Sequence, residues 1–258
     1  MSMLEDRTVM ITGASAGIGW ACAESFAAAG CRLVLVARRQ ERLQELIQQI
    51  TATHAVPILP LALDVRDRVA VEAAVTSLTA EWSEIDVLIN NAGLSRGLDR
   101  AHEATADDWE EMIDTNIKGL LWMSRAVLPG MVARDRGHLV NIGSISGHQV
   151  YPGGSVYCGT KFAVNAITQG MRMDLLGTRV RVSAVDPGMV ETDFSLVRFR
   201  GEKERADAVY RQFPPLQARD VAETVLFCAT RPPHVNINEI IVMPQDQANV
   251  YASFARGV

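Results

Sequence analysis

The sequence contains little cysteine: there are four residues among 258, and no two of them form a Cys-x-x-Cys pair. The five histidines have no carboxylate or cysteine at the spacing of metal ligands. Metal sites and disulfide frameworks usually leave such spacings in a chain. We therefore expect no metal site, and we expect the thiols to be reduced, as they are in cytoplasmic proteins.

Positive charge and long apolar runs are also lacking. The formal net charge is −5, which is opposite to what a nucleic-acid-binding surface requires. No apolar run approaches the length of a membrane span. The N-terminal residues include Glu5 and Asp6 and lead directly into a strand pattern, so we expect no secretory or transit peptide. These observations predict a cytoplasmic protein with neither nucleic-acid nor membrane partners.

Apolar residues, in contrast, make up 48% of the chain, in short runs separated by helical patterns. This alternation is typical of a parallel sheet that is buried on both faces. The predicted strands are residues 8–12, 32–37, 58–63, 87–90, 138–142, 180–185 and 239–243. We predict an α/β fold: a single doubly wound, Rossmann-type parallel sheet of about seven strands, with helices on both faces.

No linker or internal repeat interrupts this pattern, so one domain is expected to span residues 1–258. We expect a cofactor half at about 1–140 and a catalytic and substrate half at about 141–258. A helix that begins near Thr105 is predicted to break near Asn116, and residues 187–205 are predicted to be irregular.

A glycine-rich loop, TGASAGIG at residues 12–19, follows the first predicted strand and opens a helix. Gly13, Gly17 and Gly19 would let backbone amides approach a pyrophosphate, and the helix N-terminus supplies positive potential. A glycine-rich loop is weak evidence by itself, but this position after the first strand predicts a dinucleotide site.

The end of the second predicted strand indicates which dinucleotide binds. An NAD enzyme usually carries an acid there for the ribose 2′-hydroxyl, whereas this chain has Arg38 and Arg39. Two guanidiniums suit a 2′-phosphate. They could instead be a solvated helix start, although cations are disfavoured at a helix N-terminus. The pair favours NADP over NAD.

Residues 141–161 carry the candidate catalytic groups. Tyr157 and Lys161 are four residues apart, so they share a face of the predicted helix. Ser144 lies in the turn just after a strand. A cation beside a phenol lowers the phenol's pKa and makes it a usable acid–base group. The Tyr-x-x-x-Lys spacing also arises by chance on amphipathic helices, so its weight depends on the other motifs.

These motifs together resemble those of the short-chain dehydrogenase/reductases. The ordered set covers essentially the whole chain and consists of TGASAGIG at 12–19, Asn90-Asn-Ala-Gly93, Asn116, Ser144, Tyr157-x-x-x-Lys161 and Pro187-Gly188. Residues 38–46, 108–116, 196–199 and 233–238 are similar to NADP-dependent 3-hydroxy acid dehydrogenases that also oxidise serine and allo-threonine. Close relatives of that group reduce sulfoacetaldehyde or malonic semialdehyde.

The resemblance implies roles for the matching residues. Tyr157 would be the general acid in reduction and the base in oxidation, while Lys161 would lower its pKa and hold the nicotinamide ribose. Ser144 would donate a hydrogen bond to the substrate oxygen. Asn116 would anchor a water that passes protons from Lys161 to solvent.

The resemblance also implies a cofactor site. The implied residues are Gly13, Ser15, Ala16, Gly17, Ile18, Gly19, Arg38, Arg39, Asp64, Val65, Asn90, Asn91, Tyr157, Lys161, Pro187, Gly188 and Thr192. Asp64 and Val65 would border the adenine, and Thr192 would bind the carboxamide. For Asn90, Asn91 and Thr192, simple capping of backbone groups stays open as an alternative.

A small acidic substrate needs a cation at its far end. Arg198 and Arg200 lie in the segment after Gly188, and Arg96 is a rival. Arg198 is our prediction, with Ser144 and Tyr157 as the other substrate contacts, although both arginines of the segment could instead face solvent. His148, between Ser144 and Tyr157, is expected to border the substrate.

The predicted activity is hydride transfer between NADP(H) and a small hydroxy acid or the corresponding semialdehyde, and relatives are commonly homotetramers. One alternative is a generic carbonyl or 3-oxoacyl reductase. Another is a non-catalytic NADP(H)-binding sensor or scaffold. A silent protein would be expected to lose Ser144, Tyr157 or Lys161, and the chain keeps all three.

Overall fold

The structure, a computed structural model, describes residues 4–255. Its strands are β1 (Thr8–Thr12), β2 (Arg32–Ala37), β3 (Ile58–Ala62), β4 (Ile85–Asn90), β5 (Gly137–Ile142), β6 (Val180–Pro187) and β9 (Glu239–Val242), with a short pair of β7 (Val190–Glu191) and β8 (Leu216–Gln217). The first seven form one parallel sheet of order β3-β2-β1-β4-β5-β6-β9. The predicted seven-stranded parallel sheet is confirmed.

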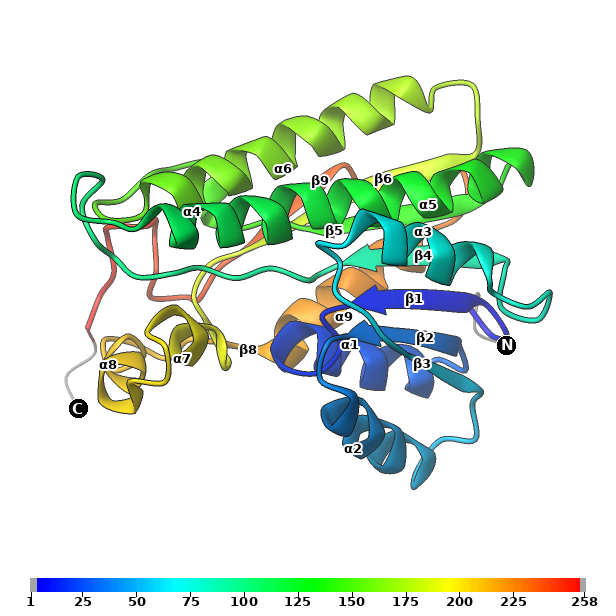
Figure 1. The fold of residues 1–258 in the computed structure, drawn as a ribbon, viewed down its shortest axis with the longest axis horizontal. Coiled ribbons are helices and arrows are strands. Elements are labelled where there is room, and N and C mark those ends of the chain that lie inside the picture. Colours follow the sequence, from blue (N-terminus) through cyan, green and yellow to red (C-terminus); the bar gives the residue numbers. More distant parts are fainter. Residues whose placement is uncertain (1–3, 256–258) are drawn as a thin grey trace.

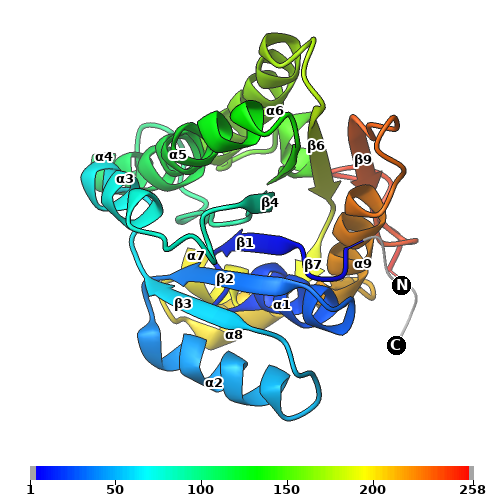
Figure 2. The same cartoon turned by 90° about the vertical axis from the view of Figure 1, so that its right-hand side faces the viewer.

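Helices lie on both faces of this sheet (Figures 1 and 2). The helices are α1 (Gly17–Ala28), α2 (Gln40–Thr51), α3 (Arg68–Thr76), α4 (Ala106–Ile113), α5 (Leu120–Ala133), α6 (Ser155–Asp174), α7 (Phe194–Arg198), α8 (Lys203–Ala208) and α9 (Ala218–Ala229). The period of two along a strand divides the core between the faces. Val9 and Ile11 pack in the core with α1, α2 and α9, whereas Met10 packs with α3 and α5.

The predicted break near Asn116 is a π-helical turn, η1 (Asp114–Gly119), that joins α4 to α5. Such turns often occur at functional sites because they re-aim a side chain. None of the helices between residues 4 and 255 is both long enough and apolar enough to cross a membrane.

The segment predicted to be irregular, residues 187–205, is more ordered than expected. It contains β7, α7 and the start of α8, and β7 pairs in parallel with β8. In Figure 1, α7 and α8 lie beyond the end of the sheet toward which the β1 arrow points. Short helices of five or six residues carry too little periodicity to be recognised in a sequence.

Candidate active site

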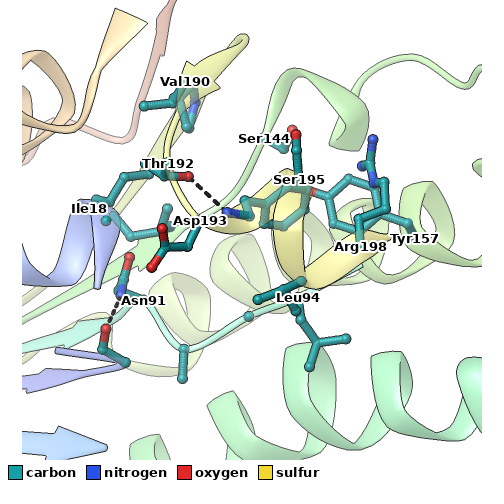
Figure 3. Close-up of a pocket in the computed structure, with 18 of the residues that line it drawn as sticks. Ile18, Asn91, Leu94, Ser144, Tyr157, Val190, Thr192, Asp193, Ser195 and Arg198 are labelled. Carbon is teal, nitrogen blue, oxygen red and sulfur yellow. Dashed lines mark hydrogen bonds between the residues drawn. The ribbon is translucent and has the colours of Figure 1, made fainter. Parts of the chain in front are cut away.

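A cavity of about 590 Å³ opens at the carboxyl ends of the strands. The sheet reverses its order between β1 and β4, and crevices at such a point are where open α/β sheets bind ligands. Gly13 follows β1 and Asn91 follows β4, and both line the cavity. In Figure 3, residues from Val190 to Arg198 extend from Ile18 to Tyr157. One continuous space therefore connects the glycine loop with the candidate catalytic groups.

The glycine loop is shaped by left-handed backbone at Gly13 (φ +67°) and Gly17 (φ +54°). A Cβ on Gly13 would lie 2.8 Å from Asn91 Nδ2, and one on Gly17 would lie 3.1 Å from Thr192 Cβ. No side chain caps the N-terminus of α1, and its first turn carries no acid. The first amide N–H groups of α1 and its dipole are therefore suited to an anion such as a pyrophosphate.

Two predicted cofactor contacts, Gly19 and Asn90, lie outside the cavity lining. A Cβ on Gly19 would lie 2.4 Å from the Gly13 carbonyl oxygen, so this glycine permits close packing beneath the loop. Asn90 is buried, and its Nδ2 donates to Ser124 and Asn141 at 2.9 Å each. In this structure Gly19 packs against the loop backbone and the Asn90 side chain binds other buried side chains, so their contact with a cofactor stays a prediction.

The two arginines after β2 both line the cavity. Arg39 donates from Nε and an Nη to the Ser15 hydroxyl at 3.2 and 3.1 Å, and so braces the glycine loop. Arg38 is exposed, and no hydrogen bond or ion pair within residues 4–255 involves its guanidinium. It is therefore the freer cation at this end of the cavity.

Asp64, predicted to contact adenine, lines the same end. Its carboxylate accepts hydrogen bonds from the backbone N–H and the guanidinium of Arg66. Partial burial raises the pKa of Asp64, but the hydrogen bonds and charge of Arg66 outweigh burial and hold the pKa below its usual value. Asp64 is thus an ionised, locally fixed group at the cavity edge.

Ser144, Tyr157 and Lys161 meet at the other end of the cavity. The Ser144 hydroxyl accepts from the Ser146 N–H at 3.1 Å, which caps the short 3₁₀ turn η2 (Ile145–Gly147), and it also hydrogen-bonds the Tyr157 phenol. Lys161 Nζ donates to the Ile142 carbonyl at 2.9 Å and lies 6.0 Å from the Tyr157 ring centroid. All three residues are at most 8% exposed.

Burial dominates the electrostatics of this group. Burial raises the pKa of Tyr157 well above its usual value, Tyr151 adds to the rise, and Arg198 and the Ser144 hydrogen bond oppose it. Burial also lowers the pKa of Lys161 to about 8, against the attraction of Asp186. The expected lowering of the Tyr157 pKa by Lys161 is not among the effects that act on this phenol: the Lys161 ammonium donates to the Ile142 carbonyl, and burial raises the Tyr157 pKa.

Asn116 is buried in η1 and does not line the cavity. Its Oδ1 accepts from the Leu94 N–H at 2.9 Å, and its Nδ2 donates to the Leu94 carbonyl at 2.9 Å and to Thr160 at 3.0 Å. The amide thus fixes the loop after β4 to α6. Its role in anchoring a water stays a prediction.

The three candidate substrate arginines have different surroundings. Arg96 pairs with Glu111 at 2.6 Å and donates to the Val197 carbonyl at 2.6 Å. Arg200 pairs with Asp108 on α4 and is outside the cavity lining. Of the three, Arg198 alone lines the cavity, and its role in binding a substrate stays a prediction.

The Arg198 guanidinium is enclosed by aromatic rings. Its Cζ lies 5.0 Å from the Phe194 ring centroid and 5.5 Å from that of Tyr157, and an Nη donates to the Tyr151 hydroxyl at 3.1 Å. The Nε is buried and has no hydrogen-bond partner among the described residues. A buried donor without a partner is costly and is suited to an anionic ligand.

His148 does not border the cavity as expected. Its Nε2 lies 2.8 Å from Asp186 Oδ2 and 3.6 Å from Glu239 Oε1, beneath the Ser144 turn. The spacing of histidines and acids along the sequence did not reveal this cluster, because its members come from three separate elements.

Several lining residues were missed in the sequence. Tyr151 lies in the same stretch as Ser144 and Tyr157, where an aromatic residue beside a turn was a usable signal. Gln247 and Val250 reach the cavity from the C-terminal segment, and Gln247 accepts from the Met189 N–H at 2.8 Å. Nothing in the sequence marked these two residues.

Comparison with known proteins gives consistent matches. A family model described as short chain dehydrogenase matches residues 7–203. The chain is 48% identical over 241 residues to the NADP-dependent 3-hydroxy acid dehydrogenase YdfG of Salmonella typhi, which covers 93% of this chain and 96% of the relative. It is 44% identical over 248 residues to the NADP-dependent 3-hydroxy acid dehydrogenase of Schizosaccharomyces pombe, with 96% of each chain covered.

Solved structures agree with this result. The closed form of serine dehydrogenase complexed with NADP+ has a TM-score of 0.90 and 46% identity, over 97% of this chain and 100% of that one. Serine dehydrogenase from Escherichia coli has a TM-score of 0.80 and 44% identity, over 93% and 99% of the two chains.

Proposed function

Because this chain belongs to the short-chain dehydrogenase family, we propose that it is an NADP-dependent oxidoreductase acting on a small 3-hydroxy acid or the corresponding semialdehyde. The relatives named for this reaction support the proposal, as does the NADP-bound neighbour. A single observation supports an acidic substrate: the Arg198 guanidinium, whose buried Nε has no hydrogen-bond partner among the described residues, lies beside Tyr157.

The cavity has the parts that NADP needs. The uncapped N-terminus of α1 suits the pyrophosphate, and the Arg38 guanidinium, which is unpaired within residues 4–255, suits a 2′-phosphate. Lys161 would hold the nicotinamide ribose, and Thr192, near Gly17, would hold the carboxamide. When bound, NADPH supplies the hydride.

The chain's own residues would handle the proton. Tyr157 is protonated at neutral pH because burial raises its pKa, so in reduction it can donate a proton to the substrate oxygen. Ser144, already hydrogen-bonded to the phenol, would stabilise the negative charge that develops on that oxygen. Phe194 packs against the Tyr157 ring, with centroids 5.6 Å apart, and helps to exclude water.

The position of Arg198 favours a short substrate. Its guanidinium carbon is 5.5 Å from the Tyr157 ring centroid, so few atoms fit between the carboxylate site and the reacting carbon. A 3-hydroxy acid is short in this sense, because a single carbon separates its carboxylate from the carbon that bears the hydroxyl group. Tyr151, which accepts from Arg198, would fix the orientation of the guanidinium.

The test is NADPH oxidation with malonic semialdehyde and with propanal, a neutral aldehyde of the same length. Arg198→Ala should lower kcat/KM for the semialdehyde by roughly 10- to 150-fold, the value of one charge-assisted hydrogen bond. Turnover of propanal should stay within about threefold, because it makes no such bond. Arg200→Gln, on the same segment but outside the cavity, is the matched control: it breaks the ion pair with Asp108, so any loss should be the same for both aldehydes.

Equal losses on both aldehydes in Arg198→Ala would show that Arg198 shapes the segment and does not bind the substrate. Tyr157→Phe gives the background, since it should bind NADPH and turn over neither aldehyde. A wild-type protein that prefers uncharged ketones would favour a generic carbonyl or 3-oxoacyl reductase.

We also propose that the protein is a cytoplasmic homotetramer with one domain over residues 1–258, acting on small molecules without nucleic-acid or membrane partners. Exposed apolar side chains on α6 support the oligomer: Phe162 is 43% exposed and Met173 is 71% exposed. Helices that leave such side chains uncovered are suited to packing against another copy.

A further inference from the structure

A buried carboxyl group lies directly beneath the catalytic turn. Asp186 is near the end of β6, and its side chain is fully buried. A Cβ on Gly143 would lie 1.7 Å from Asp186 Oδ1, so the carboxyl occupies the space that this glycine leaves free. Gly143 immediately precedes Ser144 and follows Ile142, whose carbonyl holds Lys161. The carboxyl therefore packs against Gly143, which stands between Ser144 and the residue that holds Lys161.

His148 and Asn165 complete the support of this turn. Asp186 Oδ2 lies 2.8 Å from His148 Nε2, and Asn165 Nδ2 lies 3.1 Å from the same nitrogen. Asn165 also donates to the Gly147 carbonyl at 3.2 Å, and it lies one helical turn after Lys161 on α6. The two ends of the Ser144 turn are thus tied to one cluster.

The hydrogen bonds in this cluster depend on whether Asp186 or His148 carries the proton between them. When Asp186 is ionised, a proton on His148 Nε2 is donated to the carboxylate. When Asp186 is protonated, the carboxyl donates to the single lone pair of Nε2 instead, so the direction of this hydrogen bond reverses. Protonation of Asp186 therefore changes the hydrogen bonds of the turn as well as its charge.

An unpartnered buried carboxylate oxygen is unfavourable for folding alone. Asp186 Oδ1 and Asn165 Oδ1 are both buried and have no hydrogen-bond partner among the described residues. Such groups lower stability, and where they persist they commonly serve the site. The Asp186 charge also reaches Lys161, because it opposes the lowering of that lysine's pKa by burial.

We propose that Asp186 is a positioning residue for the reaction: its ionised carboxylate, bound to His148, holds the Ser144 turn and sustains the charge on Lys161. This inference rests on the proposed oxidoreductase function. It does not depend on Arg198 or on an acidic substrate.

Three titratable groups act on this carboxyl from the elements around it: His148 after η2, Glu239 at the start of β9 and Lys161 on α6. Burial raises the pKa of Asp186 to about 6; the hydrogen bond and charge of His148 oppose the rise, and Glu239 adds to it. Below that pH the carboxyl is protonated and neutral, so the proposed support is lost as the pH falls.

The experiment measures kcat for propanal reduction at saturating NADPH between pH 5 and pH 8. In the reductive direction Tyr157 stays protonated and propanal has no titratable group. Neither of them therefore causes a fall in activity at low pH. The wild type should lose activity as the pH falls through about 6. Asp186→Asn should be slower by roughly tenfold at pH 7.5 and should lack the fall in activity near pH 6, because it keeps the shape but not the charge.

Two variants at residues outside the cavity test whether Asp186 causes the loss of activity at low pH. His148→Gln removes the group that lowers the Asp186 pKa, so the midpoint should rise by at least about 0.5 pH unit. Glu239→Gln removes the repelling carboxylate, so the midpoint should fall by a similar amount. The 2′-phosphate of the cofactor also titrates near this pH, but it would not follow these substitutions.

The proposal is overturned if Asp186→Asn keeps the wild-type fall in activity at low pH, or if neither of the two variants moves the midpoint. Rates that vanish with a chelator and return with a divalent cation would also overturn it, because the cluster would then hold an ion. Should Asp186→Asn fail to fold, the two variants still decide. Wild type that reduces no aldehyde with NADPH would instead contradict the proposed function itself.

Discussion

Arg38 and Arg39 are neighbours in the chain but have different contacts in the cavity. Arg39 is held by Ser15 and belongs to the glycine loop, whereas Arg38 has no hydrogen-bond or ion-pair partner within residues 4–255. The two adjacent arginines therefore have different roles: Arg39 supports the glycine loop, and Arg38 is available to a ligand. We expect their substitution to affect cofactor binding differently.

Replacing Arg38 with Gln should weaken NADPH binding by roughly 10- to 150-fold and hardly affect NADH, because only NADPH carries the 2′-phosphate. Arg39→Gln should weaken both cofactors, since it also loosens the glycine loop through Ser15. Dissociation constants from fluorescence titration with the two reduced cofactors would measure this. If Arg38→Gln weakened both cofactors equally, Arg38 would have no role in discrimination.

Residues predicted from local spacing agree well with the structure. Tyr157 and Lys161 meet because a four-residue separation on a helix fixes their relation whatever surrounds them. Asn116 and Asn90 were placed in the right region, but the targets of their amides depend on Leu94, Ser124 and Asn141, which come from other elements. The electrostatic balance at Tyr157 could not be predicted either, since burial decides it.

At the scale of elements, α7 is the part that brings Arg198 to the cavity. The helix has only five residues and is held at its end by backbone contacts: Arg96 donates to the Val197 carbonyl, and the Gly97 N–H donates to the Arg198 carbonyl at 3.0 Å. Arg96, fixed by Glu111, is thus a structural anchor of the segment. The sequence suggested it as a rival substrate ligand because position alone does not show what a guanidinium contacts.

Arg96→Met should therefore reduce the turnover of malonic semialdehyde and of propanal by similar factors, roughly 10-fold each, because it frees α7 and leaves Glu111 unpaired. This parallel loss contrasts with the selective loss expected for Arg198→Ala. Steady-state rates of both variants on both aldehydes, measured side by side, would distinguish the two roles. A loss confined to the semialdehyde in Arg96→Met would assign substrate binding to Arg96.

At the scale of the whole molecule, the buried charge of Lys161 lowers the free energy of unfolding. Burial lowers the pKa of Lys161 to about 8, from an ordinary value of 10.5. The folded protein thus binds this proton less tightly than the unfolded chain does. The penalty is fully present below pH 8 and is relieved as the pH rises toward 10.5, where the unfolded chain also loses the proton.

Lys161→Met should raise the free energy of unfolding at pH 7 by about 1–3 kcal/mol while abolishing turnover, since about 1.4 kcal/mol corresponds to each pH unit and the lost bond to Ile142 offsets part. Chemical denaturation at pH 7 and at pH 10 would measure this, and the gain should shrink at the higher pH. Lys118→Met, an exposed lysine paired with Asp114, is the control and should show no such gain. A gain that does not depend on pH would refute the explanation by charge burial.

The segment that carries Thr192 and Arg198 also has a kinetic consequence. Thr192 packs on Gly17 at one end, and Arg198 lies over Tyr157 at the other. The same few residues would therefore cover both the dinucleotide and the carbonyl compound. A substrate bound to Arg198 would keep the segment over the dinucleotide, so the dinucleotide would enter first and leave last. Turnover would follow a compulsory order, with release of the oxidised or reduced dinucleotide as its final step.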